Sequence, residues 1–289
     1  MFKCRFCKTF SAIKRGVKKN KSGWIPRYSC NTCGRWFVDR KGFESFRHKP
    51  EVIAAALDLR AKGVSLADVV DHLDQHHRVK VSRKTILDWQ NKFGKKLKRF
   101  TQTLKPVIGG QVHADEMFVK VRKEWNYYWD AMDYTTKFLV GDHLSKERCE
   151  DECEKFLISI KECPINLPKQ IHTDNSYDYP LPIRKIFGKD GIIHVFFPAW
   201  KKKFRNNPIE RLHNTERQTT KTFRNFDNFN STQRFFEFNK VYYNFIRKHT
   251  TINFTTPAEA AGIFLNLKRN RFLSLIEIFL PTIASGYCS

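Results

Sequence analysis

Acidic residues are scarce in this chain. Its 289 residues contain 29 Asp and Glu against 53 Lys and Arg, which gives a formal net charge of +24 at pH 7. So strong a positive field favours a polyanion as the partner, and nucleic acid is the leading candidate. With 41% hydrophobic residues the chain is not a disordered tail, and its length suffices for two or three domains.

The sequence also lacks an apolar run that could span a membrane. Its most hydrophobic segment, residues 272–284, is interrupted by Glu277 and Pro281, whereas a spanning helix needs about 20 apolar residues. No basic amphipathic helix that would bind a membrane surface is evident. The first residues are charged and rich in cysteine, unlike a secretory signal. We therefore expect a protein of the reducing cytoplasm that has no membrane partner.

Four of the eight cysteines form two Cys-x-x-Cys pairs. They are Cys4, Cys7, Cys30 and Cys33. Two such pairs present four thiolates that can close a tetrahedral Zn²⁺ site, which leaves no open position for catalysis. We predict a zinc ribbon with structural Zn²⁺ in residues 1–46, with short strands at 25–29 and 36–39; the alternative is an unmetallated cysteine cluster. A loop between the two pairs is expected to carry Lys14, Arg15, Lys18, Lys19 and Lys21.

From Pro50 onward, apolar residues recur at helical spacing. The pattern predicts three helices, the first ending near Gly63 and the next two starting after Ser65 and Ser82. Three such helices are typical of a helix-turn-helix domain, whose third helix enters the DNA major groove, although plain bundles share the pattern. We assign this domain to residues 47–104. The third-helix residues expected to face outward and contact DNA are Arg83, Lys84, Gln90 and Asn91.

A different pattern begins at Gln111, where three strands are followed by alternating helices and strands. The predicted strands are 112–122, 125–132, 137–144, 169–172 and 192–197, and the predicted helices are 146–160, 181–187 and 207–223. This order predicts an α/β domain in which helices flank a mixed sheet, as in the RNase H-like fold.

Asp115 lies on the apolar face of the first of these strands. By period-2 alternation it shares that face with Met117 and Val119, and a buried carboxylate needs a cation or several hydrogen bonds. Two later acids could complete its oxygen ligand set, namely Asp174 after the fourth strand and Glu210 near a helix start. Oxygen ligands of this kind suit Mg²⁺. Taken singly, however, each acid is also explained as an ordinary surface, turn or cap residue.

Three neighbouring acids compete with Asp115 for this role. Glu116 alternates onto the opposite face of the strand, whereas Asp130 and Asp133 lie on or after the second strand. Asp133 has the position of a turn residue, because an aspartate there can bond its own backbone. We keep Asp115 as the candidate ligand.

Glu210 also has a simpler explanation, as an acid in the first turn of a helix, where the helix dipole stabilises it. That explanation does not account for Arg217, seven residues later and on the same helix face, where it could hold a phosphate. Basic residues just before this helix are expected to follow the DNA backbone. They are Lys201, Lys202, Lys203 and Arg205.

The three acids resemble the DDE triad of transposases and retroviral integrases, with 35 residues between Asp174 and Glu210. The Asn206-x3-Glu210-x6-Arg217 spacing is similar to the motif around the glutamate in prokaryotic insertion-sequence transposases. Residues 243–249 and 256–262 resemble the closing segment of that catalytic domain.

This resemblance implies a transposase that binds the terminal inverted repeats of an insertion sequence and uses Mg²⁺ or Mn²⁺ to cleave and transfer DNA strands. It implies an RNase H-like catalytic domain at residues 105–265 and a tail at 266–289. The implied partners are double-stranded DNA and at least one further copy of the chain, in the cytoplasm at the nucleoid of a prokaryotic cell. Two rivals stay open: a DNA-binding regulator without catalysis, and a Mg²⁺-dependent nuclease without strand transfer.

Overall fold

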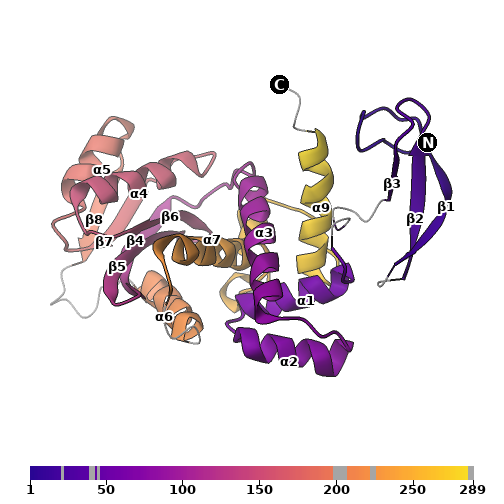
Figure 1. The fold of residues 1–289 in the computed structure, drawn as a ribbon. Helices are drawn as coiled ribbons and strands as arrows, with labels where there is room; N and C mark the ends of the chain where they lie inside the picture. Colours follow the sequence, from indigo (N-terminus) through magenta and orange to yellow (C-terminus); the bar gives the residue numbers. More distant parts are fainter. Residues whose placement is uncertain (21–22, 39–42, 44–45, 198–206, 222–225, 286–289) are drawn as a thin grey trace. The chain divides into compact units, whose positions relative to one another are not determined.

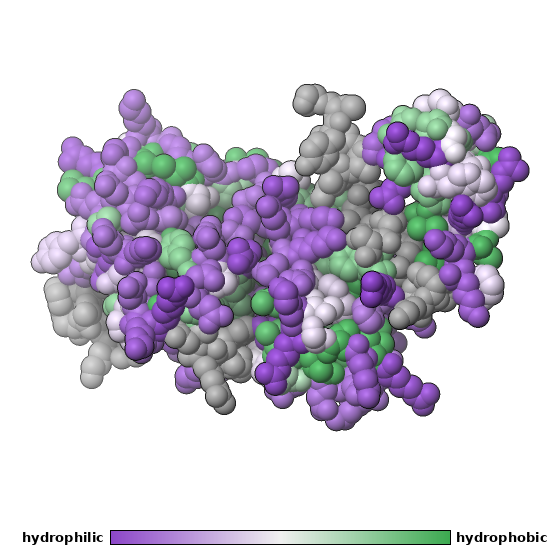
Figure 2. All heavy atoms as spheres, in the orientation of Figure 1, coloured by the Kyte–Doolittle hydropathy of each residue, from purple (hydrophilic) through white to green (hydrophobic). Residues whose placement is uncertain are grey.

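The computed structural model describes residues 1–20, 23–38, 43, 46–197, 207–221 and 226–285 (Figure 1). The chain divides into two compact units. The first consists of Met1–Leu59, Ala67–Trp89 and Leu267–Ser289, and the second of Arg60–Leu66 and Gln90–Asn266. Figure 2 shows hydrophilic side chains over much of the visible surface, as expected for a chain with a net charge of +24.

The first unit begins with an antiparallel sheet of three strands, in the order β1-β2-β3. These are β1 (Ala12–Asn20), β2 (Gly23–Cys30) and β3 (Trp36–Val38). The strands expected at 25–29 and 36–39 are confirmed as β2 and β3, although position 39 lies outside the described residues. The expected basic loop is wrong, because Lys14, Arg15, Lys18 and Lys19 lie on β1; Lys21 lies outside the described residues. The sequence pattern did not predict β1, because this strand lacks the alternation of apolar residues that a buried face imposes.

Three helices follow, at positions close to those expected. They are α1 (Pro50–Ala61), α2 (Leu66–His77) and α3 (Arg83–Thr101). Gly63 has a φ of 86°, the left-handed conformation that commonly ends a helix. At the start of α3, the Ser82 hydroxyl accepts the Thr85 N–H at 3.1 Å, which confirms the predicted cap. The last helix of the first unit is α9 (Arg271–Ser285). Among the described residues, no helix is both long and apolar enough to cross a membrane.

Gln90 does not face outward, so that expectation is wrong. Its side chain is buried, and its Oε1 accepts a hydrogen bond from Arg60 Nε at 3.2 Å. The reason is that the guanidinium of Arg60 is itself buried and needs acceptors, which Gln90 and the Val64 carbonyl supply. Asn91 is half-buried and accepts from Arg234 Nε at 3.3 Å. The exposed members of the predicted DNA-contacting set on α3 are Arg83 and Lys84.

The second unit contains a mixed sheet of five strands, in the order β6-β5-β4-β7-β8. These are β4 (Gln111–Val121), β5 (Glu124–Asp133), β6 (Leu139–Ser145), β7 (Gln170–Asp174) and β8 (Ile193–Phe197). Strands β4, β5 and β6 are antiparallel neighbours, whereas β7 pairs in parallel with both β4 and β8. The predicted α/β fold class is confirmed, because this strand order and these directions are those of an RNase H-like sheet.

Helices cover both faces of this sheet (Figure 1). They are α4 (Glu150–Glu162), α5 (Pro180–Phe187), α6 (Asn207–Lys221), α7 (Phe229–Phe245) and α8 (Pro257–Ala260), with short 3-10 turns η1 (Gly188–Asp190) and η2 (Thr250–Ile252). Helix α4 packs on β5 and β6 and contacts α5, whereas α6 packs on β4 and β5, and α7 packs on β6.

Alternation along β4 determines which side chains reach which face of the sheet. Met117, Val119 and Val121 are buried in a cluster with Phe235 and Phe236 of α7. Asp115 lies on this same face by alternation, next to α6. The sheet therefore places a carboxylate at the edge of an apolar core, as the sequence predicts.

Candidate active site and zinc centre

Three carboxylates meet where β4 passes the end of β7. Asp115, Glu116 and Asp174 each offer an oxygen, and these oxygens lie within 4.8 Å of one another. The parallel pairing of β4 with β7 ends at His113 opposite His172. Two residues further along both strands, Asp115 and Asp174 come next to each other, since neighbouring strands are about 4.8 Å apart. The structure thus brings two of the three predicted acids together.

Asp115 is held in surroundings that disfavour its negative charge. Its side chain is 20% exposed, and burial raises its pKa to about 7, with Glu116 and Asp174 adding to the rise and His213 opposing it. A cation would remove this penalty by neutralising the carboxylates. Because the three nearby groups offer only oxygen ligands, the set fits a hard divalent ion such as Mg²⁺ or Mn²⁺.

Glu116, the competitor of Asp115, is already engaged on the other face of the sheet. Its carboxylate forms an ion pair with Arg148 and accepts the Tyr179 hydroxyl at 2.8 Å. The Arg148 guanidinium also lies 3.0 Å from Asp178 Oδ2 and 3.9 Å from Asp174 Oδ2. The contact with Asp178 is an ion pair without a well-aligned hydrogen bond, since Arg148 Nε has no hydrogen-bond partner in the part of the chain that the structure describes.

Arg148 was missed by sequence reasoning, and no local signal could have found it. It precedes α4 in a stretch of ordinary charged residues, and only the folded sheet brings it to the acids. Burial opposes its charge, but Glu116, Asp178 and Asp174 raise its pKa overall. The guanidinium is therefore a fixed positive charge at this cluster.

Glu210 and Arg217 lie on α6, and both side chains are exposed. Glu210 belongs to none of the clusters of three potential metal ligands found among the described residues. One turn along the helix, however, His213 is buried, and its Nδ1 lies 3.5 Å from Asp115 Oδ2. Residues three apart on a helix have Cβ atoms about 5–6 Å apart. Glu210 thus lies one helical turn from His213, the residue of α6 that contacts Asp115.

A second cluster, which sequence reasoning did not anticipate, lies behind Asp115. Asp130, His213 and Glu216 are all buried, and the His213 Nε2 is 2.7 Å from Asp130 Oδ1. Asp130 Oδ2 and Glu216 Oε2 have no hydrogen-bond donor among the described residues. Burial raises the pKa of both carboxyl groups well above the usual range. A proton shared between the two acids satisfies both oxygens, and the pair then supports the imidazole that contacts Asp115.

Asp133, the other competing acid, is confirmed as a turn residue. Its Oδ1 accepts the Gly109 N–H at 3.0 Å, and its Oδ2 accepts both the N–H and the hydroxyl of Thr136. With both oxygens satisfied in this way, Asp133 is engaged in the turn.

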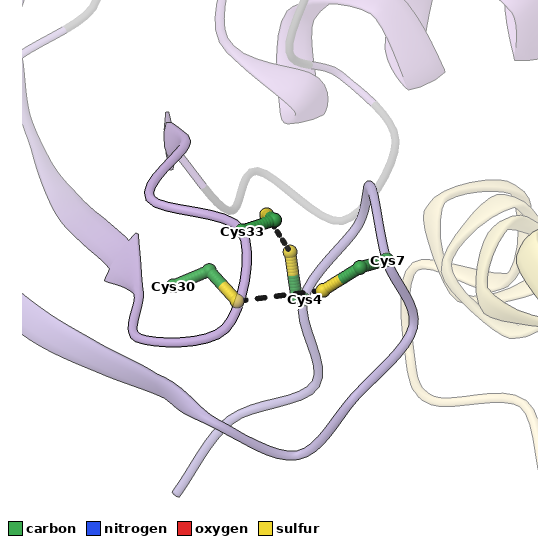
Figure 3. Close-up of side chains that lie close together, drawn as sticks. All are labelled: Cys4, Cys7, Cys30 and Cys33. Atoms are coloured by element: carbon green, nitrogen blue, oxygen red, sulfur yellow. Dashed lines mark hydrogen bonds between the residues drawn. The ribbon is translucent and has the colours of Figure 1, made fainter.

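The four cysteine sulfurs converge at one point (Figure 3). All four are free thiols, with Cys4 Sγ 3.7 Å from Cys33 Sγ and Cys7 Sγ 3.4 Å from Cys30 Sγ. A tetrahedron of sulfurs around Zn²⁺, with Zn–S bonds of ~2.3 Å, has edges of about 3.8 Å. A hydrogen bond with the Ser11 hydroxyl lowers the pKa of Cys30 to about 5, which favours the thiolate. The distances and the thiol chemistry fit a structural zinc ion.

The basic residues expected before α6 cannot be placed. Lys201, Lys202, Lys203 and Arg205 lie outside the described residues.

Residues 109–249 match a family model described as a DDE domain. These residues form the DDE domain of a transposase. The chain is accordingly an enzyme of the polynucleotidyl transferase class with an RNase H-like core. Such DDE domains use divalent metal ions, which agrees with the oxygen-only cluster next to Asp115.

One curated protein and several solved structures are each similar to somewhat more than half of the chain. The Uncharacterized protein MJ0017 of Methanocaldococcus jannaschii is 29% identical over 174 residues, which cover 57% of this chain and 78% of that protein. The HTLV-2 integrase catalytic core domain in complex with magnesium has a TM-score of 0.43 at 13% identity, covering 54% of this chain and 99% of that chain. The BIV integrase catalytic core domain has a TM-score of 0.39 at 14% identity, and the match covers 52% of this chain and 92% of that chain.

Proposed function

We propose that this DDE transposase binds the terminal inverted repeats of an insertion sequence and cleaves and joins DNA strands with Mg²⁺ or Mn²⁺. The observation that carries the proposal is the meeting of Asp115 and Asp174 at the end of β7, with Asp115 in contact with His213 of α6, the helix that also bears Glu210. Two acids from distant strands and one from a helix form the oxygen ligand set that phosphodiester chemistry needs.

Asp115, Asp174 and Glu210 would hold the divalent ions. When bound, such ions activate an attacking oxygen and stabilise the leaving oxygen at phosphorus. Asp115 is pre-positioned by β4 and by His213, whereas the exposed Glu210 is free to rotate toward the pair. Burial raises the pKa of Asp115 to about 7, and the neighbouring acids add to the rise, so a cation that offsets both effects would be bound favourably.

Two arginines have supporting roles in this proposal. Arg148 keeps Glu116 and Asp178 paired, and this leaves Asp115 and Asp174 as the acids that turn to the substrate. Arg217 has an exposed guanidinium two helical turns from Glu210, where it can hold a phosphate oxygen of the DNA. Neither arginine supplies a proton, because a guanidinium stays charged at any working pH.

DNA recognition is assigned to the modules outside the DDE domain. We propose that residues 1–46 form a zinc ribbon, that 47–104 form a helix-turn-helix domain, that 105–265 form the catalytic domain, and that 266–289 are a tail. Arg83 and Lys84 are exposed on α3 and can contact DNA. Lys201, Lys202, Lys203 and Arg205 are proposed to follow its backbone. Transposition joins two element ends, so the active form contains at least two copies of the chain and acts on DNA of the nucleoid.

A strand-transfer assay tests this function, with duplexes that carry pre-cut element ends and a supercoiled target in Mg²⁺ or Mn²⁺. The wild type should join ends to target, whereas Asp115→Asn, Asp174→Asn and Glu210→Gln should each lower joining by about 10²- to 10³-fold or more. All three should still bind the ends. The matched control is Glu124→Gln, which removes an exposed acid at the start of β5 and should join normally.

The alternatives give different outcomes in the same assay. A wild type that shifts DNA but gives no joined product would support the regulator, and one that gives only hydrolysed ends would support the nuclease. An Asp115→Asn or Glu210→Gln variant that joins at the wild-type rate would remove that residue from the site.

A further inference from the structure

A pocket of about 760 Å³ lies next to α6, on the sheet face that carries Asp115. Its walls come from β4, β5, the turn after β5, α6 and the segment after α7. The charged side chains in its lining are all basic: Lys137, Arg211 and Arg247, together with the imidazoles of His113 and His249. No acidic side chain among the described residues lines this pocket, which we call the basic pocket.

The cations of the basic pocket form no ion pair with an acid among the described residues, although Asp133 lies near enough to Lys137 to attract it. Within the part of the chain that the structure describes, no ion pair joins Lys137, Arg211 or Arg247 to an acid. Lys137 instead donates to the Tyr134 carbonyl at 2.6 Å and lies over the Tyr134 ring. Burial, and to a lesser degree the neighbouring Arg211, lower the pKa of Lys137, whereas Asp133 opposes this change. An anion that enters between these cations is therefore stabilised.

A half-buried imidazole also lines the basic pocket. His249 Nε2 is buried and has no hydrogen-bond partner among the described residues. Burial lowers the pKa of His249 to about 4, with Arg247 and Lys137 adding to the effect. The imidazole of His249 is therefore neutral and adds no positive charge to the pocket.

The position of the basic pocket indicates the source of the anion. His113 precedes Asp115 by two residues on the same face of β4, which places their Cα atoms about 7 Å apart. On α6, Arg211 directly follows Glu210. A B-form strand rises about 3.4 Å per nucleotide along its axis. A phosphate in the pocket would thus lie about one or two nucleotides from a phosphodiester at the acid pair.

We propose that the basic pocket binds a phosphate of the same DNA strand whose neighbouring phosphodiester lies at Asp115, Asp174 and Glu210. The proposal rests on the proposed function and adds a substrate subsite to it. Arg211 and Arg247 present planar guanidinium groups that can take two phosphate oxygens at once, and Lys137 adds a point charge. The subsite fixes the register of the strand, so that one particular phosphodiester reaches the acids.

The binding of the full chain to one DNA probe tests this subsite. The probe is a duplex from the DNA that flanks the coding region, ending at the boundary of the element, and affinity is measured over a range of KCl concentrations. Arg211→Gln and Arg247→Gln should each bind about tenfold more weakly. The slope of log affinity against log salt should become shallower by about 0.9, because each variant neutralises one phosphate fewer than the wild type. Arg211→Lys, which keeps the charge, should recover much of the affinity.

The control removes the same charge elsewhere in the unit. Lys189→Gln alters an exposed lysine of η1 that does not line the pocket, and it should leave both affinity and slope unchanged. All variants should unfold at the wild-type temperature. Equal affinities and slopes for Arg211→Gln, Arg247→Gln and Lys189→Gln would overturn the subsite.

Neutral methylphosphonates, placed singly along the probe strand, locate the phosphate. At one position, within one or two nucleotides of the joining end, the methylphosphonate should lower the affinity of the wild type for the probe. The same methylphosphonate should not lower the affinity of Arg211→Gln any further, because in a double-mutant cycle two changes that remove the same contact do not add. If no position shows this coupling, the subsite is wrong, and inorganic phosphate that binds the wild type but not Arg211→Gln would then identify a free-anion site. A wild type that does not bind or join the probe would refute the proposed function itself, whereas variants that bind like the wild type would refute only the subsite.

Discussion

At the scale of single residues, the account depends on the unfavourable surroundings of Asp115. Its folded-state pKa of about 7 lies above the ordinary value of 3.8, so the folded protein binds this proton more tightly than the unfolded chain does. The associated stability is complete below about pH 4 and is lost as the pH rises through 7, by at most about 4 kcal/mol. In metal-free solution, the charge on Asp115 therefore opposes folding.

The variant Asp115→Asn should remove this pH dependence, because an amide does not ionise. Without metal it should unfold at a higher urea concentration than the wild type at pH 8, with little difference near pH 4. Adding Mg²⁺ at pH 8 should raise the melting temperature of the wild type but not of the variant. Glu124→Gln, an exposed acid, serves as the control. If the urea concentration of unfolding changes with pH in the same way for the wild type and for Asp115→Asn, then burial does not disfavour the charge of this carboxyl.

Residue-level prediction from sequence succeeded where a local pattern carried the information. Alternation identified the apolar face of Asp115, and turn chemistry identified Asp133. It failed for Gln90, whose burial depends on a buried arginine 30 positions earlier in the chain. Arg148, His213 and Glu216 were also not assigned, because their roles arise only when strands and helices from distant segments meet.

At the scale of elements, we expect the cysteine sheet β1-β2-β3 to depend on a structural zinc ion. Three short strands bury little apolar surface, so such a module gains most of its stability from a structural ion. Spacing alone predicted the four ligands, and the sulfur distances of 3.4 and 3.7 Å agree with a tetrahedral site. Strand β1 was not predicted, because its polar sequence has no buried face that would impose alternation.

Zinc removal should unfold this sheet. Metal analysis of the wild type should find one Zn²⁺ per chain, and Cys30→Ser should lose it together with the protection of residues 1–38 from proteolysis. Cys149→Ser changes a cysteine outside the cluster and should keep the metal. Two results together would contradict the assignment of a zinc site. The wild-type chain would contain no zinc, and a chelator would not change how well residues 1–38 resist proteolysis.

At the scale of the whole molecule, the positive and the negative side chains differ in their distribution. The chain has a net charge of +24, which draws it to DNA, while its acid cluster occupies one small area at the end of β7. The order of strands and helices along the chain could be predicted, because each strand and helix has its own period. The convergence of Asp115 and Asp174 depends on the register of β4 with β7, and sequence patterns do not specify that register. It was expected from the apolar surroundings of Asp115, which call for a cation and further oxygen ligands, and from the family resemblance.

The most direct test of the central claim is the anomalous scattering of Mn²⁺ in a crystal of the full chain with an element-end duplex. The account predicts Mn²⁺ peaks that are bound by Asp115 and Asp174, with Glu210 turned toward them. A Mn²⁺ ion bound only by Asp130, His213 and Glu216, or by Glu116 in place of Glu210, would contradict it.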